Sequence, residues 1–293
     1  MRTAMSWMVS MLLLAAPARA DRGFIPHKPD VKIFEPTQRA MIAWDGKEEI
    51  LLLTTDVRAS EKTVVLEILP CPSEPRVTKG SLDTFRRATR VINRHLHQPR
   101  ISARSRSRGG GPPSGPAGEI TFHKKIGAHD ISVAHVLSGD GFVSWVEKAL
   151  AKEGVKNPEV PAWARKAVEE YIREGFDWFV FDSIELGPRL RSAVPIRYRF
   201  PTGRLFYPLK ITKVAGPTTV DLIVLTPKLL SRFDGIPASR IGLPHQPFAI
   251  GKQELEHIDK EMATLLGHQE GMKLRIWKIH DGGRGFERDL IAH

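Results

Sequence analysis

Residues 41–54 read MIAWDGKEEILLLT, and this stretch decides the fold class. The Asp45-Gly46 dipeptide suits the tight turn of a β-hairpin, so we predict strands over 41–44 and 49–54 on either side of it. Within the second strand, Leu51-Leu52-Leu53 is apolar without alternation. Such a run predicts a strand that is covered on both faces, as in the interior of a layered protein.

Further strands and helices are predicted on both sides of this hairpin. Strands are expected over 63–69, 119–125, 130–137, 176–186, 196–200, 205–211, 219–225 and 273–279. Apolar residues at helical spacing predict helices over 82–96, from Asp140 or Gly141 to Leu150, over 162–174 and over 253–266. Runs of strands interrupted by helices predict an α+β fold with largely antiparallel sheets and three to four helices.

The first twenty residues have the three parts of a cleavable secretory signal. Arg2 supplies the positive start, a short apolar run follows, and Ala18-Arg19-Ala20 ends the stretch with a small-x-small pattern. A membrane span requires roughly 20 apolar residues, and this run is shorter. We therefore expect cleavage after Ala20, a mature chain without a transmembrane anchor, and a periplasmic or extracellular location.

The positive charge of the chain is concentrated in one interval. The formal net charge is +11, and no acidic residue lies between Asp83 and Glu119. The arginines of this interval are Arg86, Arg87, Arg90, Arg94, Arg100, Arg104, Arg106 and Arg108. The first four belong to the helix predicted over 82–96 and are expected on its solvent-facing side.

Residues 98–118 are rich in Arg, Ser, Gly and Pro, and we expect a flexible basic linker or insertion there. It would separate a β-rich part over 21–97 from an α+β part over 119–293, or interrupt one domain built from both. Two hypotheses concern its charge. Either Arg100, Arg104, Arg106 and Arg108 bind an anion, or the segment is a solvated loop without a dedicated ligand. Export argues against nucleic acid as the partner and favours an anionic envelope component or an acidic protein.

Local motifs for catalysis or cofactor binding are absent from the sequence. The sequence contains no GxxxxGK[ST], GxSxG, CxxC or HExxH, so we expect no cofactor. Glu254 and His257 form a single ExxH, which is either a metal-binding pair or, as we expect, part of a solvated helix surface. No metal site is predicted from it.

His129 is the first histidine to test for a catalytic role. His129 and His135 would share one face of a continuous strand, whereas Asp130 would point to the opposite face. The two histidines could bind zinc if a carboxylate such as Asp130 or Glu119 approached from elsewhere, although the direction of Asp130 counts against the simplest version of such a site. The alternative is a histidine that is hydrogen-bonded into the fold.

Cys71 and the aromatic run over 176–181 are each expected in the interior. Cys71 is the only cysteine, so disulfides cannot stabilise the chain, and its place after an apolar strand favours burial over a reactive thiol. The aromatic run is expected to be a core strand, with an exposed sugar-stacking platform as the alternative.

Seven short strings, in order along the chain, resemble a known family. They are DRGFIP (21–26), EP with QRA (35–40), AWDG (43–46), LEILP with PSEP (66–75), IGAHDI (126–131), FVSW (142–145) and YPLK (207–210). Together they resemble the secreted prokaryotic family catalogued as domain of unknown function 2330. The resemblance implies export and a single module, but it transfers no catalytic residues. Cys71 and the Arg-Ser-Gly linker depart from its pattern.

Three hypotheses about function follow from these observations. The first is a non-enzymatic, exported binding protein of the cell envelope or extracellular space, which the localised positive charge favours. The alternative is a secreted hydrolase with a site near His129 and Asp130. A purely structural role is the third reading.

Overall fold

The structure, a computed structural model, describes residues 23–28, 31–96, 120–126, 129–152, 154–155, 158–212, 219–267, 272–281 and 285–293, with the backbone alone for 120–126. The predicted signal over 1–20 lies outside these residues. So do Arg100, Arg104, Arg106 and Arg108 of the predicted basic linker.

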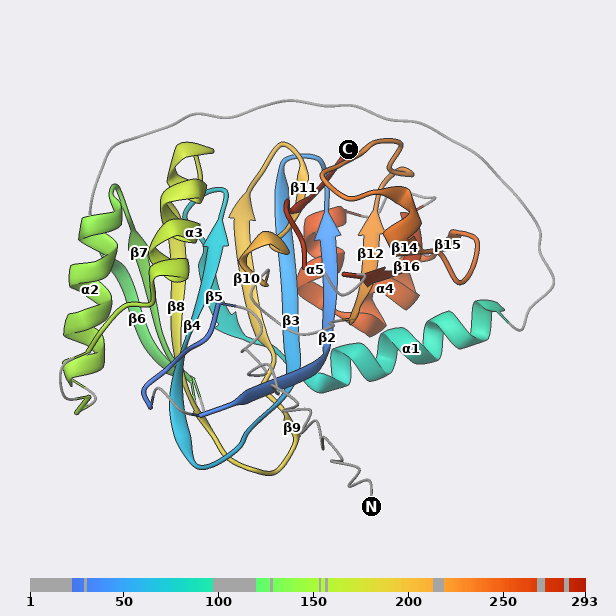
Figure 1. The fold of residues 1–293 in the computed structure, drawn as a ribbon. Coiled ribbons are helices and arrows are strands. Elements are labelled where there is room, and N and C mark those ends of the chain that lie inside the picture. Colours follow the sequence, from blue (N-terminus) through green and yellow to red (C-terminus); the bar gives the residue numbers. More distant parts are fainter. Residues whose placement is uncertain are drawn as a thin grey trace, which may run out of the picture.

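The described chain forms two large sheets and one small one (Figure 1). The five-stranded sheet has the order β1 (Ile25–Pro26), β4 (Thr63–Cys71), β8 (Trp178–Leu186), β7 (His129–His135) and β6 (Ile120–Ile126). The nine-stranded sheet has the order β14 (Ile241–Gly242), β16 (Met272–His280), β12 (Thr219–Thr226), β2 (Ile33–Trp44), β3 (Glu48–Ala59), β10 (Ile196–Pro201) and β5 (Arg76–Lys79), with β15 (Phe248–Ile250) on β16 and β9 (Arg191–Ser192) on β3. The small sheet has the order β11 (Leu205–Tyr207), β17 (Leu290–Ala292) and β13 (Phe233–Asp234).

Two groups of helices cover the outer faces of the large sheets (Figure 1). Helices α2 (Gly139–Lys152) and α3 (Ala162–Arg173) pack on the five-stranded sheet. Helices α1 (Leu82–Leu96), α4 (Lys252–Ile258) and α5 (Lys260–Leu266) pack on the nine-stranded sheet. Two short 3-10 helices, η1 (Lys210–Thr212) and η2 (Ala238–Arg240), lie in connections.

The predicted α+β class with largely antiparallel sheets is confirmed. Among the strand pairs of the described residues, β2 with β12 is the parallel one. Both large sheets contain strands from before and after the 98–118 segment, because β4 pairs with β8 and β2 pairs with β12.

The hairpin predicted around Asp45-Gly46 is present, and its strands are longer than predicted. The carboxylate of Asp45 accepts hydrogen bonds from the backbone N–H groups of Lys47 and Glu48, at 2.7 and 2.8 Å. Gly46 has a φ of 102°, which favours glycine. The strand 51–53 is covered on both faces as predicted: Leu51 and Leu53 belong to the cluster between the sheets, and Leu52 packs toward α1.

Two predicted elements are corrected by the structure. The helix predicted over 253–266 is two helices, because Asp259 adopts an extended conformation and caps α5 with its side chain; this break gives five α-helices in the described residues instead of three to four. The strand predicted over 205–211 ends at Tyr207, because Pro208 has no N–H to donate and the carboxylate of Asp289 accepts the next two N–H groups, each at 2.7 Å.

None of the helices in the described residues has the length and apolar character that a membrane span requires.

Candidate functional site

Three neighbouring strands place a row of charged side chains on the outer face of the nine-stranded sheet. Arg39 of β2 is paired in register with Asp221 of β12, and Asp221 is paired with Lys278 of β16. Paired residues point to the same face and neighbouring strands lie about 4.8 Å apart, so the three side chains form a cation–acid–cation row. Lys278 Nζ lies 3.6 Å from Asp221 Oδ1.

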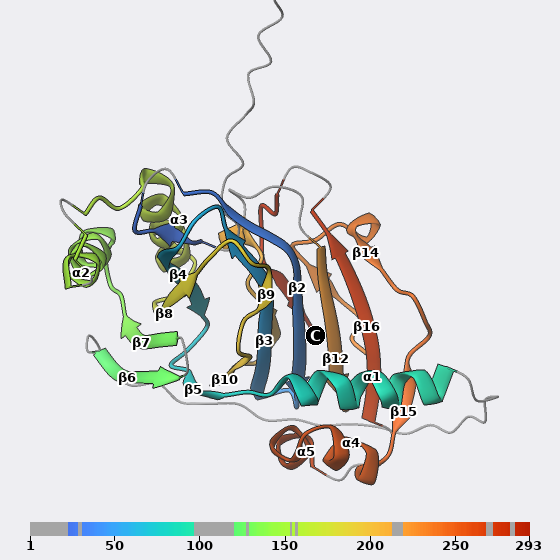
Figure 2. The same cartoon turned by 90° about the horizontal axis from the view of Figure 1, so that it is seen from below.

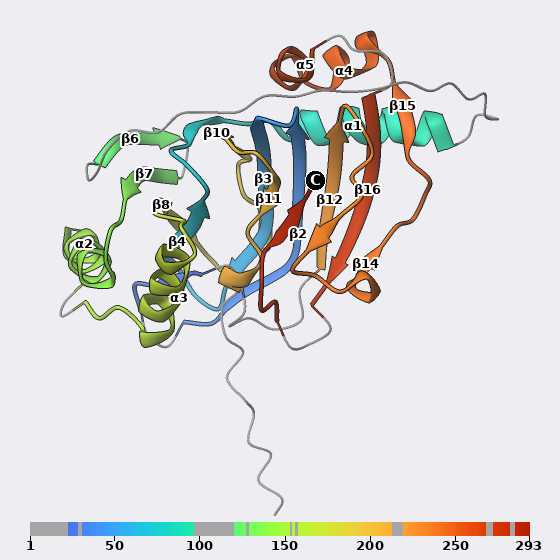
Figure 3. The ribbon, with the colours of Figure 1, turned by 90° about the horizontal axis from the view of Figure 1, so that it is seen from above.

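An apolar row runs beside the charged row. Two residues further along the same strands, Met41, Ile223 and Ile276 are paired in register and belong to the cluster under α1. Helix α1 crosses β2, β12 and β16 near one end of these strands (Figures 2 and 3), so the charged row lies beyond the helix. The apolar residues are therefore covered by α1, and the charged residues border its edge.

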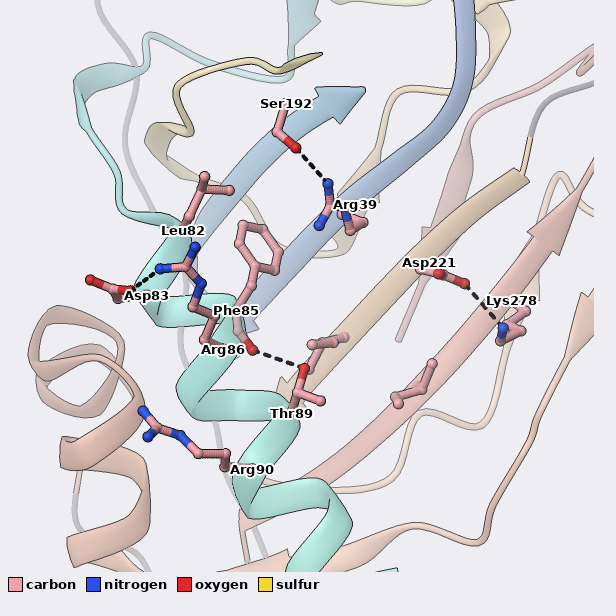
Figure 4. A pocket seen from close by; sticks show the side chains of 12 residues that line it. Arg39, Leu82, Asp83, Phe85, Arg86, Thr89, Arg90, Ser192, Asp221 and Lys278 are labelled. Carbon is pink, nitrogen blue, oxygen red and sulfur yellow. Dashed lines mark hydrogen bonds and ion pairs between the residues drawn. The ribbon is translucent and has the colours of Figure 1, made fainter. Parts of the chain in front are cut away.

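A hollow of about 830 Å³ lies between α1 and this face of the sheet, and we call it the α1 groove. Its lining residues are Arg39, Leu82, Asp83, Phe85, Arg86, Thr89, Arg90, Ser192, Asp221, Ile223, Ile276 and Lys278. Figure 4 shows Arg39, Asp221 and Lys278 on neighbouring strands beside Phe85 of α1. The groove thus combines an apolar floor with a charged border.

Arg39 is held in place by hydrogen bonds that use only one end of its guanidinium group. Arg39 Nη2 donates to Asp56 Oδ1 at 2.5 Å and to Ser192 Oγ at 2.9 Å, and Ser192 Oγ donates to the same Asp56 oxygen at 2.6 Å. Within the described residues, Nε is buried without a hydrogen-bond partner, and Nη1 makes no hydrogen bond. The group is therefore oriented in advance, and Nη1 is the nitrogen that keeps donors for a ligand.

The groove carries one excess positive charge. Ion pairs join Arg39 to Asp56, Lys278 to Asp221 and Arg86 to Asp83, the last at 2.8 Å. Among the described lining residues, Arg90 is the cation left over, and it projects from the side of α1 that faces away from the strands (Figure 4).

The arginines of α1 do not all lie on a free solvent-facing surface. Arg87 Nε donates to the carbonyl oxygen of Ile258 at 3.0 Å, which ties α1 to α4. Arg94 lies 3.4 Å from Glu254, and His95 Nε2 lies 2.9 Å from the same carboxylate. Glu254 of the ExxH pair therefore contacts α1. Across the described residues, no group of three or more His, Cys, Asp or Glu side chains is arranged to hold a metal.

His129 lies in the protein interior and is bonded to a carboxylate from the neighbouring strand. His129 Nδ1 lies 2.5 Å from Asp182 Oδ2, and the two side chains are 3% and 2% exposed. Asp130 lies at the next position of β7 and is not this partner. Glu67 of β4 is paired in register with Asp182 and is also buried, so a polar cluster lies on this face of the five-stranded sheet.

His135 has a partner of its own. Its Nε2 lies 2.8 Å from Asp177 Oδ2, and its ring stacks on Trp178 with centroids 4.6 Å apart. Farther along the aromatic run, Phe179 and Phe181 are fully buried in the core under α2 and α3. The run is thus chiefly a core strand, as predicted.

Cys71 is buried, as predicted, and burial raises the pKa of its thiol. The nearby Glu49 is also fully buried, and burial raises the pKa of its carboxyl group well above the ordinary value. One oxygen of Glu49 accepts a hydrogen bond from the backbone N–H of Phe206 at 2.8 Å, which joins β3 to β11. Both groups are structural parts of the core.

The fold and the groove define an α+β protein with two large sheets, a small third sheet, two helical layers and a hollow with a charged border on one outer face. A family model described as "Uncharacterized protein conserved in bacteria (DUF2330)" matches residues 16–241. The chain belongs to this family. The sequence resemblance drawn from short strings is thereby confirmed, apart from the secretion that it implied.

Comparisons with other proteins add little. No curated protein matches the chain. Crystal structures of baculovirus P35 are similar: a mutated P35 after caspase cleavage has 10% identity, covers 89% of this chain and 99% of its own, and has a TM-score of 0.42. The crystal structure of baculovirus P35 has 13% identity, covers 89% and 97%, and has a TM-score of 0.41. With TM-scores below 0.5, we draw no conclusion from this likeness.

Proposed function

We propose that this protein is an exported, non-enzymatic binding protein and that the α1 groove holds an anionic ligand. The observation that carries the proposal is Arg39, whose guanidinium group is fixed at Nη2 by Asp56 and Ser192 while Nη1 keeps unused donors at the groove. A guanidinium group that is fixed in this way is suited to carboxylate and phosphate groups, because its remaining N–H groups can donate charge-assisted hydrogen bonds to their oxygens.

Lys278 supports the same interpretation from the other end of the charged row. Its side chain is half exposed and lies at 3.6 Å from Asp221, so it is available to a ligand as well. The volume of the groove, about 830 Å³, lies within the range that sites for one small molecule occupy.

The export part of the proposal is supported by the signal-like residues 1–20 and by nothing in the fold. Outside the cytoplasm, a positive surface meets anionic envelope components and acidic proteins, and such partners are the proposed source of the ligand. Anion binding by Arg100, Arg104, Arg106 and Arg108 stays a separate prediction.

No observation favours the hydrolase alternative. His129 has its carboxylate partner in Asp182, but both side chains are almost fully shielded from solvent and neither lines the α1 groove. A substrate would have to reach the space between the two large sheets to meet them.

Fluorescence anisotropy of carboxyfluorescein with the purified full chain tests the groove. We expect saturable binding that Lys278→Glu weakens about tenfold or more, because hydrogen bonds to charged groups contribute about 1.5–3 kcal/mol each. The matched control is Lys166→Glu, the same charge change on an exposed position of α3. Equal affinities for the wild type and Lys278→Glu, or equally strong binding of the cationic dye rhodamine 6G, would overturn the proposal.

A further inference from the structure

We infer that residues 241–250 form a pH-sensitive latch on the outer edge of β16, which opens when the imidazole ring of His245 gains a proton. This inference goes beyond the proposed function and needs no ligand in the α1 groove. It is carried by a hydrogen bond in which the ring of His245 takes the place that a backbone carbonyl group has in a sheet.

The latch covers both ends of this edge with backbone pairs and leaves the middle without them. Ile241 of β14 is paired with Ile279, and Phe248 of β15 is paired with Leu274. Figure 2 shows β14 and β15 along the side of β16 that faces away from β12. Between them, residues 243–247 form no strand pair within the described part of the chain. A backbone N–H group of β16 that points outward here therefore needs another partner.

His245 is that partner. The N–H group of Ile276 donates a hydrogen bond to Nε2 of His245 at 3.2 Å. Nδ1 of the same ring lies 2.8 Å from the carbonyl oxygen of Gln246, which can only accept, so Nδ1 carries the hydrogen atom. The ring is therefore neutral when the latch is closed. A second proton would occupy Nε2 and leave the N–H group of Ile276 without its acceptor.

Few other contacts hold the middle of the latch. The ring of His245 lies against Phe248 with centroids 5.5 Å apart, and the carbonyl oxygen of His245 accepts a hydrogen bond from Arg275 Nε at 3.3 Å. All side chains of residues 243–247 are exposed or half-buried, so opening uncovers little apolar surface. Loss of one hydrogen bond can therefore shift the balance between the closed and the open latch. Because the closed latch requires a neutral ring, a falling pH favours the open one.

The second histidine beside the latch is expected to respond to acid in the opposite way. His95 of α1 stacks on Phe248 with centroids 4.5 Å apart, and its Nε2 lies 2.9 Å from a carboxylate oxygen of Glu254. A proton on His95 strengthens this ion pair and does not break it. Weakening of the latch in acid is therefore assigned to His245. The remaining charged groups that β16 places beside the latch are Lys273, Arg275 and Lys278.

The test is hydrogen exchange of the backbone N–H group of Ile276 in the full chain, followed by NMR at about pH 8 and about pH 5. We expect the protection factor, which removes the effect of pH on exchange itself, to fall about tenfold in acid, the effect of one lost hydrogen bond. In His245→Gln, the side-chain oxygen can still accept but does not titrate, so the protection factor should not change with pH. His95→Gln is the matched control and should keep the fall of the wild type.

The N–H group of Trp277 supplies an internal control, because N–H groups alternate along a strand and this one points toward β12. It should stay protected at both pH values, and a fall equal to that at Ile276 would mean that the whole sheet opens and would overturn the inference. Equal protection of Ile276 at both pH values in the wild type, or an unchanged fall in His245→Gln, would overturn it as well. Should His245→Gln fail to fold, His245→Ala removes the acceptor from the half-buried position and should show low protection of Ile276 at both pH values. Protection at the wild-type level in His245→Ala would contradict the latch.

Discussion

Replacement of Asp259 by alanine is expected to destabilise the protein strongly, because this side chain joins three elements at once. Asp259 Oδ1 accepts hydrogen bonds from the N–H groups of Glu261 and Met262, both at 3.1 Å, and so caps α5. Its other oxygen forms an ion pair with Arg197 of β10 and accepts a hydrogen bond from the hydroxyl of Thr84 in α1 at 3.3 Å. The side chains of Asp259 and Arg197 are 6% and 15% exposed.

The size of the effect follows from these contacts. Loss of a helix cap costs about 1 kcal/mol, and removal of one partner of a buried ion pair costs about 3–5 kcal/mol. Arg197 retains Glu261 at 2.8 Å, so the lower end of the second range applies. We expect Asp259→Ala to lower the free energy of unfolding by about 4 kcal/mol in total. Asp259→Asn keeps a cap acceptor and should lose about 3 kcal/mol.

Urea unfolding followed by tryptophan fluorescence measures both variants. The control is Asp140→Ala, which removes an aspartate that is also ion-paired but is 85% exposed, and which should leave the unfolding midpoint unchanged. A loss below about 1 kcal/mol for Asp259→Ala would refute the reasoning, since the cap alone should cost that much. An Asn variant as unstable as the Ala variant would refute the contribution of the cap.

Other positions give three shorter predictions. Because Cys71 is buried, its thiol should react slowly with dithionitrobenzoate in the native protein and at once in urea; rapid native reaction would contradict the packing. Burial raises the pKa of Asp289 from 3.8 to about 6, so between these pH values the folded state holds a proton that the unfolded state has lost. The free energy of unfolding should therefore fall as the pH rises through this window, by about 3 kcal/mol in all. Asp289→Asn should flatten this slope in urea titrations at several pH values, and a wild-type slope of opposite sign would disprove it. Gly235→Ala should lower the free energy of unfolding clearly more than Gly154→Ala does. Both glycines have a positive φ, but a Cβ at Gly235 would lie 2.3 Å from the carbonyl oxygen of Asp289, whereas a Cβ at Gly154 would meet nothing within 4 Å. Equal unfolding midpoints for the two glycine variants would show that the close approach has no effect.

Local signals determined a large part of this fold. The Asp45-Gly46 turn, the two-sided strand at Leu51-Leu52-Leu53 and the helix over 82–96 depend on the spacing of nearby residues, and each was predicted from that spacing. The break at Asp259 was missed because apolar spacing continues across it. Its capping role depends on partners, such as Arg197, that lie far away in the sequence.

Long-range pairing decided the candidate site. Well over a hundred residues of sequence separate Arg39 from Asp221. These two residues form a row with Lys278 only because β2 pairs in parallel with β12 in one particular register. The partner of His129 was equally beyond reach, since Asp182 comes from the neighbouring strand β8. The sequence by itself determined which segments become strands and helices, because propensity and alternation act over a few residues. Which strands lie side by side, and therefore which charges share a face, was decided only by the tertiary structure, because hydrogen-bonded register is a property of two distant segments together.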